Sequence, residues 1–184
     1  MKRIIFALCA SLLLLSATFS NISSPQADPP IRFEIRKGFW SVEGHFNEVE
    51  THIRFTPDAV EQMVLLGKAK VNSIDTDNST RDRHLMGAEW FDEAQHPEIQ
   101  MQAVAIEPTA AGYTGTFLIT VKGQRINQEL NFILEEKQEN SYLTASFSLR
   151  REAFTLEGSN PIMEAMLGDE VQVYLNIPLN ATAS

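Results

Sequence analysis

Apolar and polar residues alternate with a period of two over most of the chain beyond residue 30. Between Tyr113 and Val121, for example, aromatic and aliphatic side chains alternate mainly with threonines. Successive side chains of an extended strand point to opposite faces, so the pattern predicts strands with one apolar and one polar face. The alternating runs are Ile31–Ile35, Trp40–Phe46, Glu50–Phe55, Leu65–Val71, Ile99–Ala105, Tyr113–Val121, Ile126–Leu134, Leu143–Leu149 and Val171–Ile177.

These strands follow one another through short turns such as Ala110–Tyr113 and Val121–Arg125, which predicts antiparallel neighbours. A single flat sheet this wide would leave its apolar face in water and its edge strands open. The sheet must therefore close into a barrel or fold into a sandwich. We expect an all-β domain with a few short helices, at Thr56–Met63, after Asn78 and at Ser159–Gly168.

Small residues occupy the apolar face of several predicted strands. Close-packed cores normally fill such positions. An internal cavity is therefore expected unless neighbouring Phe, Trp and Met side chains fill the space, and the sequence leaves both outcomes open. These small residues are Gly67, Ala69, Ala103, Ala105, Gly115 and Ala145.

Residues 1–20 have the pattern of a secretory signal peptide. Lys2 and Arg3 precede an apolar run from Ile4 to Leu15, which is too short to span a bilayer comfortably. We expect residues 21–30 to form a flexible leader and residues 31–180 to form one domain. Cleavage would remove Cys9, the only cysteine, so the mature chain would have neither a disulfide nor a thiol nucleophile.

The mature chain is expected to be strongly acidic. Without Lys2 and Arg3, 13 basic residues stand against 24 acidic ones, which gives a formal charge of −11. This charge disfavours nucleic acid and anionic membrane surfaces as partners.

The segment Ser73–Pro97 concentrates carboxylates, arginines and two histidines between predicted strands. As a metal site it is weak, because His84 and His96 are 12 residues apart and no glycine or later glutamate completes a calcium loop after Asp75. As a hydrolase site it is also weak, since no glycine elbow presents Ser73 as a nucleophile.

A structural connection fits this segment better. Asn78 or Ser79 would cap a short helix, and Asp82 in its first turn would interact favourably with the helix dipole. Arg81 would pair with Asp75 or Asp82. One end of the barrel would then be covered by the apolar side chains of Leu85, Met86, Trp90 and Phe91.

The same segment resembles the signature of the YceI-like lipid-binding family. "SIDTDNSTRDRHL" is similar to its Ser-Ile-Asp-Thr and Arg-Asp-x-His-Leu elements, and "EWFDEAQHP" to its aromatic pair followed by Asp and Pro, with Trp90 where Phe is usual. The stretches "SVEGHF", "GTFLITVKGQRINQELNF", "RREAF" and "LGDEVQVYLNI" extend the resemblance over Phe33–Ile177. The chain departs from the pattern where "QADPPIRF" lacks a His-Ser pair and where Lys37 replaces a histidine, so a polar head group would be held differently.

The resemblance implies an eight-stranded antiparallel lipocalin-like barrel in the periplasm of a Gram-negative bacterium. It implies a long polyisoprenoid or isoprenoid quinone held inside, and neither catalytic residues, nor a metal, nor a catalytic cofactor. The candidate lining residues at inward positions are Phe33, Ile35, Trp40, Val71, Trp90, Phe91, Ile99, Met101, Ala103, Phe117, Ile119, Leu130, Phe132, Ala145, Phe147, Val173 and Leu175. The candidate polar residues at the mouth are Arg81, Asp82, His84 and Arg151.

Three classes of function stay open. The first is a carrier or reservoir for a long isoprenoid or fatty lipid, the second an enzyme that acts on a lipid through Asp82 and His84, and the third a structural or stress-related protein whose lipid is bound passively. We expect no nucleic-acid partner and no stable insertion into a membrane, and a homodimer is left open.

Overall fold

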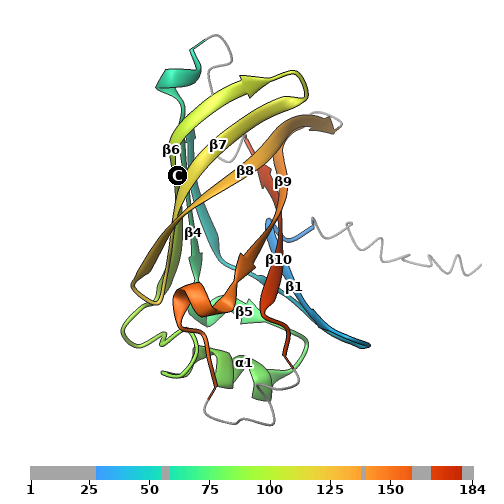
Figure 1. The fold of residues 1–184 in the computed structure, drawn as a ribbon, viewed down its shortest axis with the longest axis vertical. Coiled ribbons are helices and arrows are strands. Elements are labelled where there is room, and N and C mark those ends of the chain that lie inside the picture. The colour runs from blue at the N-terminus through green and yellow to red at the C-terminus, as the bar shows by residue number, and fades with distance from the viewer. Residues whose placement is uncertain (1–27, 55–58, 138–139, 159–166, 180–184) are drawn as a thin grey trace, which may run out of the picture.

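One antiparallel sheet of ten strands forms the body of the protein (Figure 1). The computed structural model of the chain describes residues 28–54, 59–137, 140–158 and 167–179. Across the sheet the strand order is β3-β4-β6-β7-β8-β9-β10-β1-β2-β5. The strands are β1 (Ile31–Lys37), β2 (Trp40–Phe46), β3 (Val49–Arg54), β4 (Val64–Lys70), β5 (Ile74–Asp75), β6 (Glu98–Thr109), β7 (Gly112–Val121), β8 (Gln124–Lys137), β9 (Asn140–Arg150) and β10 (Glu170–Pro178).

The sheet curls into a half-barrel because β2 and β3, which follow one another directly along the chain, lie near opposite ends of the strand order. Only Asn47 and Glu48 separate β2 from β3, and the chain there pairs with β1 on one side of the bend and with β4 on the other. The bend is fixed at Ser73, whose carbonyl accepts from the Asn47 N–H and whose hydroxyl accepts from the Glu48 N–H, both at 3.0 Å. In the opposite direction the Lys70 N–H donates to the Glu48 carbonyl.

The all-β class predicted from the alternation is confirmed, but the count of eight strands was too low. The bend divides one strand into β2 and β3, and the two-residue β5 follows β4 after the short 3-10 helix η2 (Val71–Ser73). In the part of the chain that the structure describes, the other 3-10 helices are η1 (Val60–Gln62) and η3 (Arg151–Phe154).

Tight turns set the register of the long hairpins. Lys122 and Gly123 both have positive φ, 48° and 74°, and join β7 to β8 directly after the Val121–Gln124 pair. A two-residue turn with positive φ at both positions matches the right-handed twist of the flanking strands. The alternation in β7 then places Gly115, Phe117, Ile119 and Val121 on the buried face.

The one α-helix among the described residues is α1 (Ser79–Met86), where the sequence predicts it. Asn78 is its cap, since the side-chain oxygen accepts from the backbone N–H groups of Thr80 and Arg81 at 3.1 and 3.0 Å. The helix predicted at Thr56–Met63 is reduced to η1, and residues 56–58 lie outside the described part. The helix predicted at Ser159–Gly168 lies almost wholly outside it; Leu167 and Gly168 are not helical.

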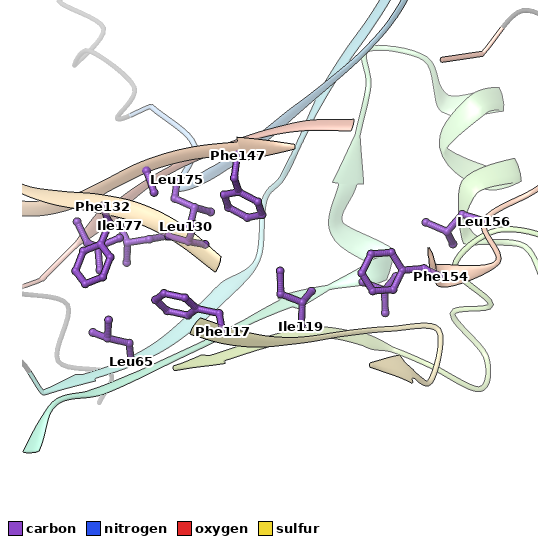
Figure 2. Packing of buried hydrophobic residues seen from close by; sticks show 13 residues of the cluster. Leu65, Phe117, Ile119, Leu130, Phe132, Phe147, Phe154, Leu156, Leu175 and Ile177 are labelled. Atoms are coloured by element: carbon purple, nitrogen blue, oxygen red, sulfur yellow. The ribbon is translucent and has the colours of Figure 1, made fainter. Parts of the chain in front are cut away.

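The concave face of the sheet carries the main hydrophobic core. Phe117 and Ile119 from β7 point toward Leu130 and Phe147 from β8 and β9, whereas Phe154 lies nearer α1 (Figure 2). The interior is thus built almost entirely from the positions that the period-two pattern marks as apolar. None of the helices in the described part has the length and hydropathy needed to cross a membrane.

Candidate functional site

An apolar cavity of about 200 Å³ lies on the concave side of the sheet. Its walls are inward-facing side chains from both ends of the strand order, including Phe33 on β1, Ile53 on β3, Met101 on β6 and Leu175 on β10. The polar residues among its lining are few, namely Thr51, Gln100, Arg150 and Arg151.

Most of the lining residues predicted from inward parity border this cavity. These are Phe33, Ile35, Trp90, Phe91, Ile99, Met101, Phe117, Ile119, Leu130, Phe147, Val173 and Leu175. Residues of the same inward faces that the prediction omitted also border it, among them Ile31, Phe46, Leu65, Leu143, Val171 and Ile177.

Five predicted lining residues lie elsewhere. Trp40 is exposed at 68 % because the β1–β2 hairpin extends past the strands that would cover it. Val71 belongs to η2 and is almost fully buried, and Phe132 is buried in a stack with Tyr113 at a centroid distance of 5.3 Å. Ala103 and Ala145 pack with the core but do not border the cavity.

Some of the small inward-facing residues are covered by neighbouring aromatic side chains, and others leave space that belongs to the cavity. A side chain added at Gly115 would come within 2.7 Å of the Phe117 ring, so a neighbouring aromatic already fills that space. At Gly67 an added Cβ would meet no atom within 4 Å, and Gly67 and Ala69 both border the cavity. The cavity therefore owes part of its width to β4.

Non-strand segments close one end of the cavity, and we call their apolar side chains the cavity floor. The floor lies at the end of the sheet that carries α1 (Figure 1). Of the four side chains that the sequence predicts as a cover for one end, Leu85, Trp90 and Phe91 border the cavity and Met86 does not. Phe154 and Leu156 were not predicted, because they lie in η3 and just after it. The floor consists of Leu85, Trp90, Phe91, Phe154 and Leu156.

Arg151 holds the floor together. Its Nε donates to the Gly168 carbonyl at 2.8 Å and its Nη1 to the Leu156 carbonyl at 2.7 Å. The guanidinium also lies over the Trp90 ring, 5.7 Å from its centroid. Arg151 is 6 % exposed, and this many contacts is what a buried guanidinium needs to offset the loss of water.

Arg81 and Asp82, predicted at the cavity mouth, instead fix the chain before α1. Asp82 accepts from the backbone N–H and the hydroxyl of the buried Thr76 at 3.1 and 2.5 Å. Arg81 donates to the Thr76 hydroxyl and carbonyl at 2.8 and 2.5 Å, where the sequence suggested an acidic partner. Nearby, a hydrogen bond from the Asp77 N–H holds the pKa of Asp75 below its usual range.

The two histidines of the Ser73–Pro97 segment do not come together. His84 is exposed on α1, and His96 packs against Gly123 of the β7–β8 turn. Neither borders the cavity. Among the described residues, no three His, Cys, Asp or Glu side chains group as a metal ion would require.

On the outer face of the sheet, a cross-strand ion cluster ties β4 to β6. The Glu98 carboxylate forms ion pairs with Lys70 Nζ at 2.5 Å and with Lys68 Nζ at 3.1 Å. The Glu50 carboxylate on β3 lies 3.6 Å from Lys70 Nζ. Hydrogen bonds from Lys70 and Lys68 lower the pKa of Glu98 to about 2. The charged face therefore lies outside the barrel and the apolar face inside it.

One known protein family matches most of the chain. Residues 20–179 match the YceI-like domain family. A UPF0312 protein of Photorhabdus laumondii is 24 % identical over 129 residues, which cover 67 % of each chain.

Solved structures share the fold at low identity. BcnA of Burkholderia cenocepacia superposes with a TM-score of 0.74 at 19 % identity, over 80 % of this chain and 94 % of that one. A YceI protein of Campylobacter jejuni gives 0.65 at 20 % identity, over 78 % and 86 %. A polyisoprenoid-binding domain of Saccharophagus degradans gives 0.60 at 14 % identity, over 82 % and 94 %.

Proposed function

We propose, from the premise that this chain belongs to the YceI-like domain family, that it is a periplasmic carrier for a long apolar lipid. The lipid would be a polyisoprenoid or an isoprenoid quinone with its tail inside the half-barrel. Family membership and the likeness to a polyisoprenoid-binding domain support a lipid-binding protein. We add to this three points of our own: the protein carries the lipid, the lipid has an isoprenoid tail, and the protein works in the periplasm.

The observation that carries the proposal is the cavity itself. A well-packed domain of this size would fill such a space, yet β4 presents Gly67 and Ala69 to it. Its lining is aliphatic and aromatic apart from Thr51, Gln100, Arg150 and Arg151. An apolar space of this kind suits a ligand whose binding depends on shape and exclusion of water rather than on polar contacts.

The binding energy would come from the tail. Each buried CH₂ contributes roughly 0.8 kcal/mol, so one five-carbon isoprene unit contributes about 4 kcal/mol before ordering costs. Three buried units would contribute on the order of 12 kcal/mol on the same basis. This is enough for tight binding with few hydrogen bonds.

The charged lining residues favour a neutral head group. Arg151 already donates to two carbonyls, and Arg150 Nε lies 2.7 Å from Glu152 Oε1. A phosphate head would have to compete with these contacts, whereas a quinone or an alcohol would need only one or two donors.

The positions of Asp82 and His84 favour a carrier over a lipid-modifying enzyme. Asp82 is engaged with Thr76, His84 is exposed, and neither borders the cavity. A general acid or base must reach the reacting atoms of its substrate. The proposal therefore includes no catalytic step.

Analysis of co-purifying lipid tests the proposal. Mass spectrometry of the organic extract should identify an isoprenoid lipid bound to the wild-type protein. Gly67→Phe should fill the cavity, keep the β-rich far-UV spectrum and lower the bound lipid by about tenfold or more, because a ring at this position would displace much of one tail unit. Gln102→Phe places the same ring on the exposed face of β6 and should leave the bound lipid unchanged.

Equal lipid content in Gly67→Phe and wild type would refute binding in the cavity. A bound lipid without isoprene units would refute the isoprenoid assignment alone. Cell fractionation together with the N-terminal sequence of the mature protein would test the periplasmic location, which a cytoplasmic, uncleaved chain would contradict.

A further inference from the structure

The tip of the β1–β2 hairpin presents two uncovered aromatic side chains. Phe39 is fully exposed, and Trp40 is exposed at 68 %. The turn that presents them lies directly after Lys37 and depends on Gly38, whose φ of +59° favours glycine. In Figure 1 this hairpin, drawn in blue, extends away from the body of the sheet.

The inner face of this hairpin continues the wall of the cavity. Phe33 and Ile35 border the cavity from β1. Their strand neighbours place Val42 opposite Ile35 and Trp40 opposite Lys37. Because directly paired residues share a face of the sheet, an apolar track runs from Ile35 through Val42 to Trp40.

Two basic residues come just before the aromatic pair, and one of them is ion-paired. Lys37 and Arg36 precede it, and the Arg36 side chain is 73 % exposed while it donates to Glu34. The whole chain, by contrast, has a formal charge of −9. An anionic surface would therefore repel this tip, where Lys37 lies, less than it repels the rest of the molecule.

We propose that Phe39 and Trp40 dock the hairpin reversibly into the interfacial region of a lipid bilayer, so that a lipid tail passes along the inner face of β1 and β2 into the cavity. This inference rests on the proposed carrier function. Aromatic side chains flanked by cations are the residues that settle at membrane–water interfaces. Two such side chains give only a marginal hold, which suits a carrier that must leave again.

A second protein molecule fits this tip less well. Phe and Trp bury about 150–250 Å² each, so the pair offers at most about 500 Å². A stable protein interface needs roughly 800 Å² from each partner. A bilayer sets no such requirement, because it adapts to a small protruding wedge.

Flotation with vesicles of equal parts phosphatidylethanolamine and phosphatidylglycerol tests the docking. We expect wild-type protein to float with the vesicles and the double variant Phe39→Ser, Trp40→Ser to bind about tenfold less. Val104→Ser is the matched control, since Val104 is an exposed apolar residue on β6 at 64 % and should not affect flotation.

Fluorescence places the contact at the tip. In a Trp90→Phe background Trp40 is the one remaining tryptophan. Vesicles should shift its emission to the blue, and brominated acyl chains should quench it. An unshifted Trp40 together with unchanged flotation of the double variant would overturn the proposal. So would a wild-type dimer in sedimentation that the double variant loses, which would assign the tip to a second copy of the chain.

The two proposals fail separately. If wild type carries cavity lipid but the double variant floats as well as wild type, docking at this tip is wrong and the carrier function stands. If the tip docks on vesicles but no lipid is extracted from the protein, the carrier function is wrong and the docking stands.

Discussion

The guanidinium of Arg151 lies over the indole ring of Trp90, 5.7 Å from its centroid, and so joins η3 to the segment that follows α1. A buried arginine next to an apolar cavity is costly unless its donors are used. Here they bind the carbonyls of Gly168 and Leu156. Arg151 therefore links the segments that form the cavity floor, and its contacts should stabilise their packing against one another.

We predict that Arg151→Met destabilises the protein by about 2–4 kcal/mol, because two carbonyls lose a charged donor in a buried place. Urea unfolding would measure the change. Arg150→Met is the control: Arg150 and Glu152 are both well exposed, and surface pairs contribute at most about 1 kcal/mol. Equal effects of the two substitutions would show that Arg151 is not a structural anchor.

Asp82→Ala should lower the free energy of unfolding by about 2 kcal/mol, through loss of the bonds to Thr76 and of a favourable charge in the first turn of α1. Bound lipid per folded molecule should not change. His84→Ala, at an exposed position of the same helix, should have little effect on either quantity. Loss of bound lipid from fully folded Asp82→Ala protein would place Asp82 in ligand binding instead.

Acid should weaken the contribution of Glu98 to stability. Its pKa is lowered to about 2 by Lys70 and Lys68, against an ordinary value of 4.5, so its stabilisation is complete above pH 4.5 and is lost as the pH falls toward 2. The difference in unfolding free energy between wild type and Glu98→Gln should therefore be larger at pH 6 than at pH 2. Glu107→Gln, at an exposed position of the same strand, provides the comparison. A difference independent of pH would contradict the role given to the lysines.

The affinity of the protein for a lipid should depend more on the length of the tail than on the head group. Prenyl alcohols, quinones and fatty amides of equal tail length should bind within about tenfold of one another, or about 1.4 kcal/mol, since each polar contact contributes only about 1 kcal/mol. Removing one isoprene unit should cost more. Competition binding with a matched series would decide this. A hundredfold preference among head groups at constant tail length would reveal a polar site, for which Arg150 and Arg151 in the cavity lining are the candidates.

Period-two alternation was sufficient to predict the sheet and the inward strand faces from which most of the cavity wall is built, although many individual lining residues were not named. It placed Phe33, Phe117 and Leu175 on the inner face because a strand allows only two directions for a side chain. It placed Trp40 wrongly because parity gives the face but not whether another strand lies over it. The expected count of eight strands did not anticipate that a bend at Asn47–Glu48 would divide one strand.

The floor was harder to predict. Leu85, Trp90 and Phe91 were recognised as a cover, but Phe154 and Leu156 lie on either side of Thr155, whose φ is 52°, and no periodic signal extends through such a turn. The partner of Arg81 was also missed. Charge suggested a carboxylate, whereas the Thr76 hydroxyl and carbonyl are brought within reach by a backbone reversal at Asp77, whose φ is 58°.

The position of β3 at the end of the strand order affects how the protein behaves at high concentration. An edge strand can act as a template for an incoming strand of another chain and so seed fibrils. The exposed positions of β3 are Glu50, His52 and Arg54, two of which carry opposite charges. Identical copies stacked in parallel register, as in many fibrils, would place Glu50 opposite Glu50 and Arg54 opposite Arg54. Like charges directly opposite one another destabilise strand pairing, which should help to keep concentrated solutions of the protein free of aggregates.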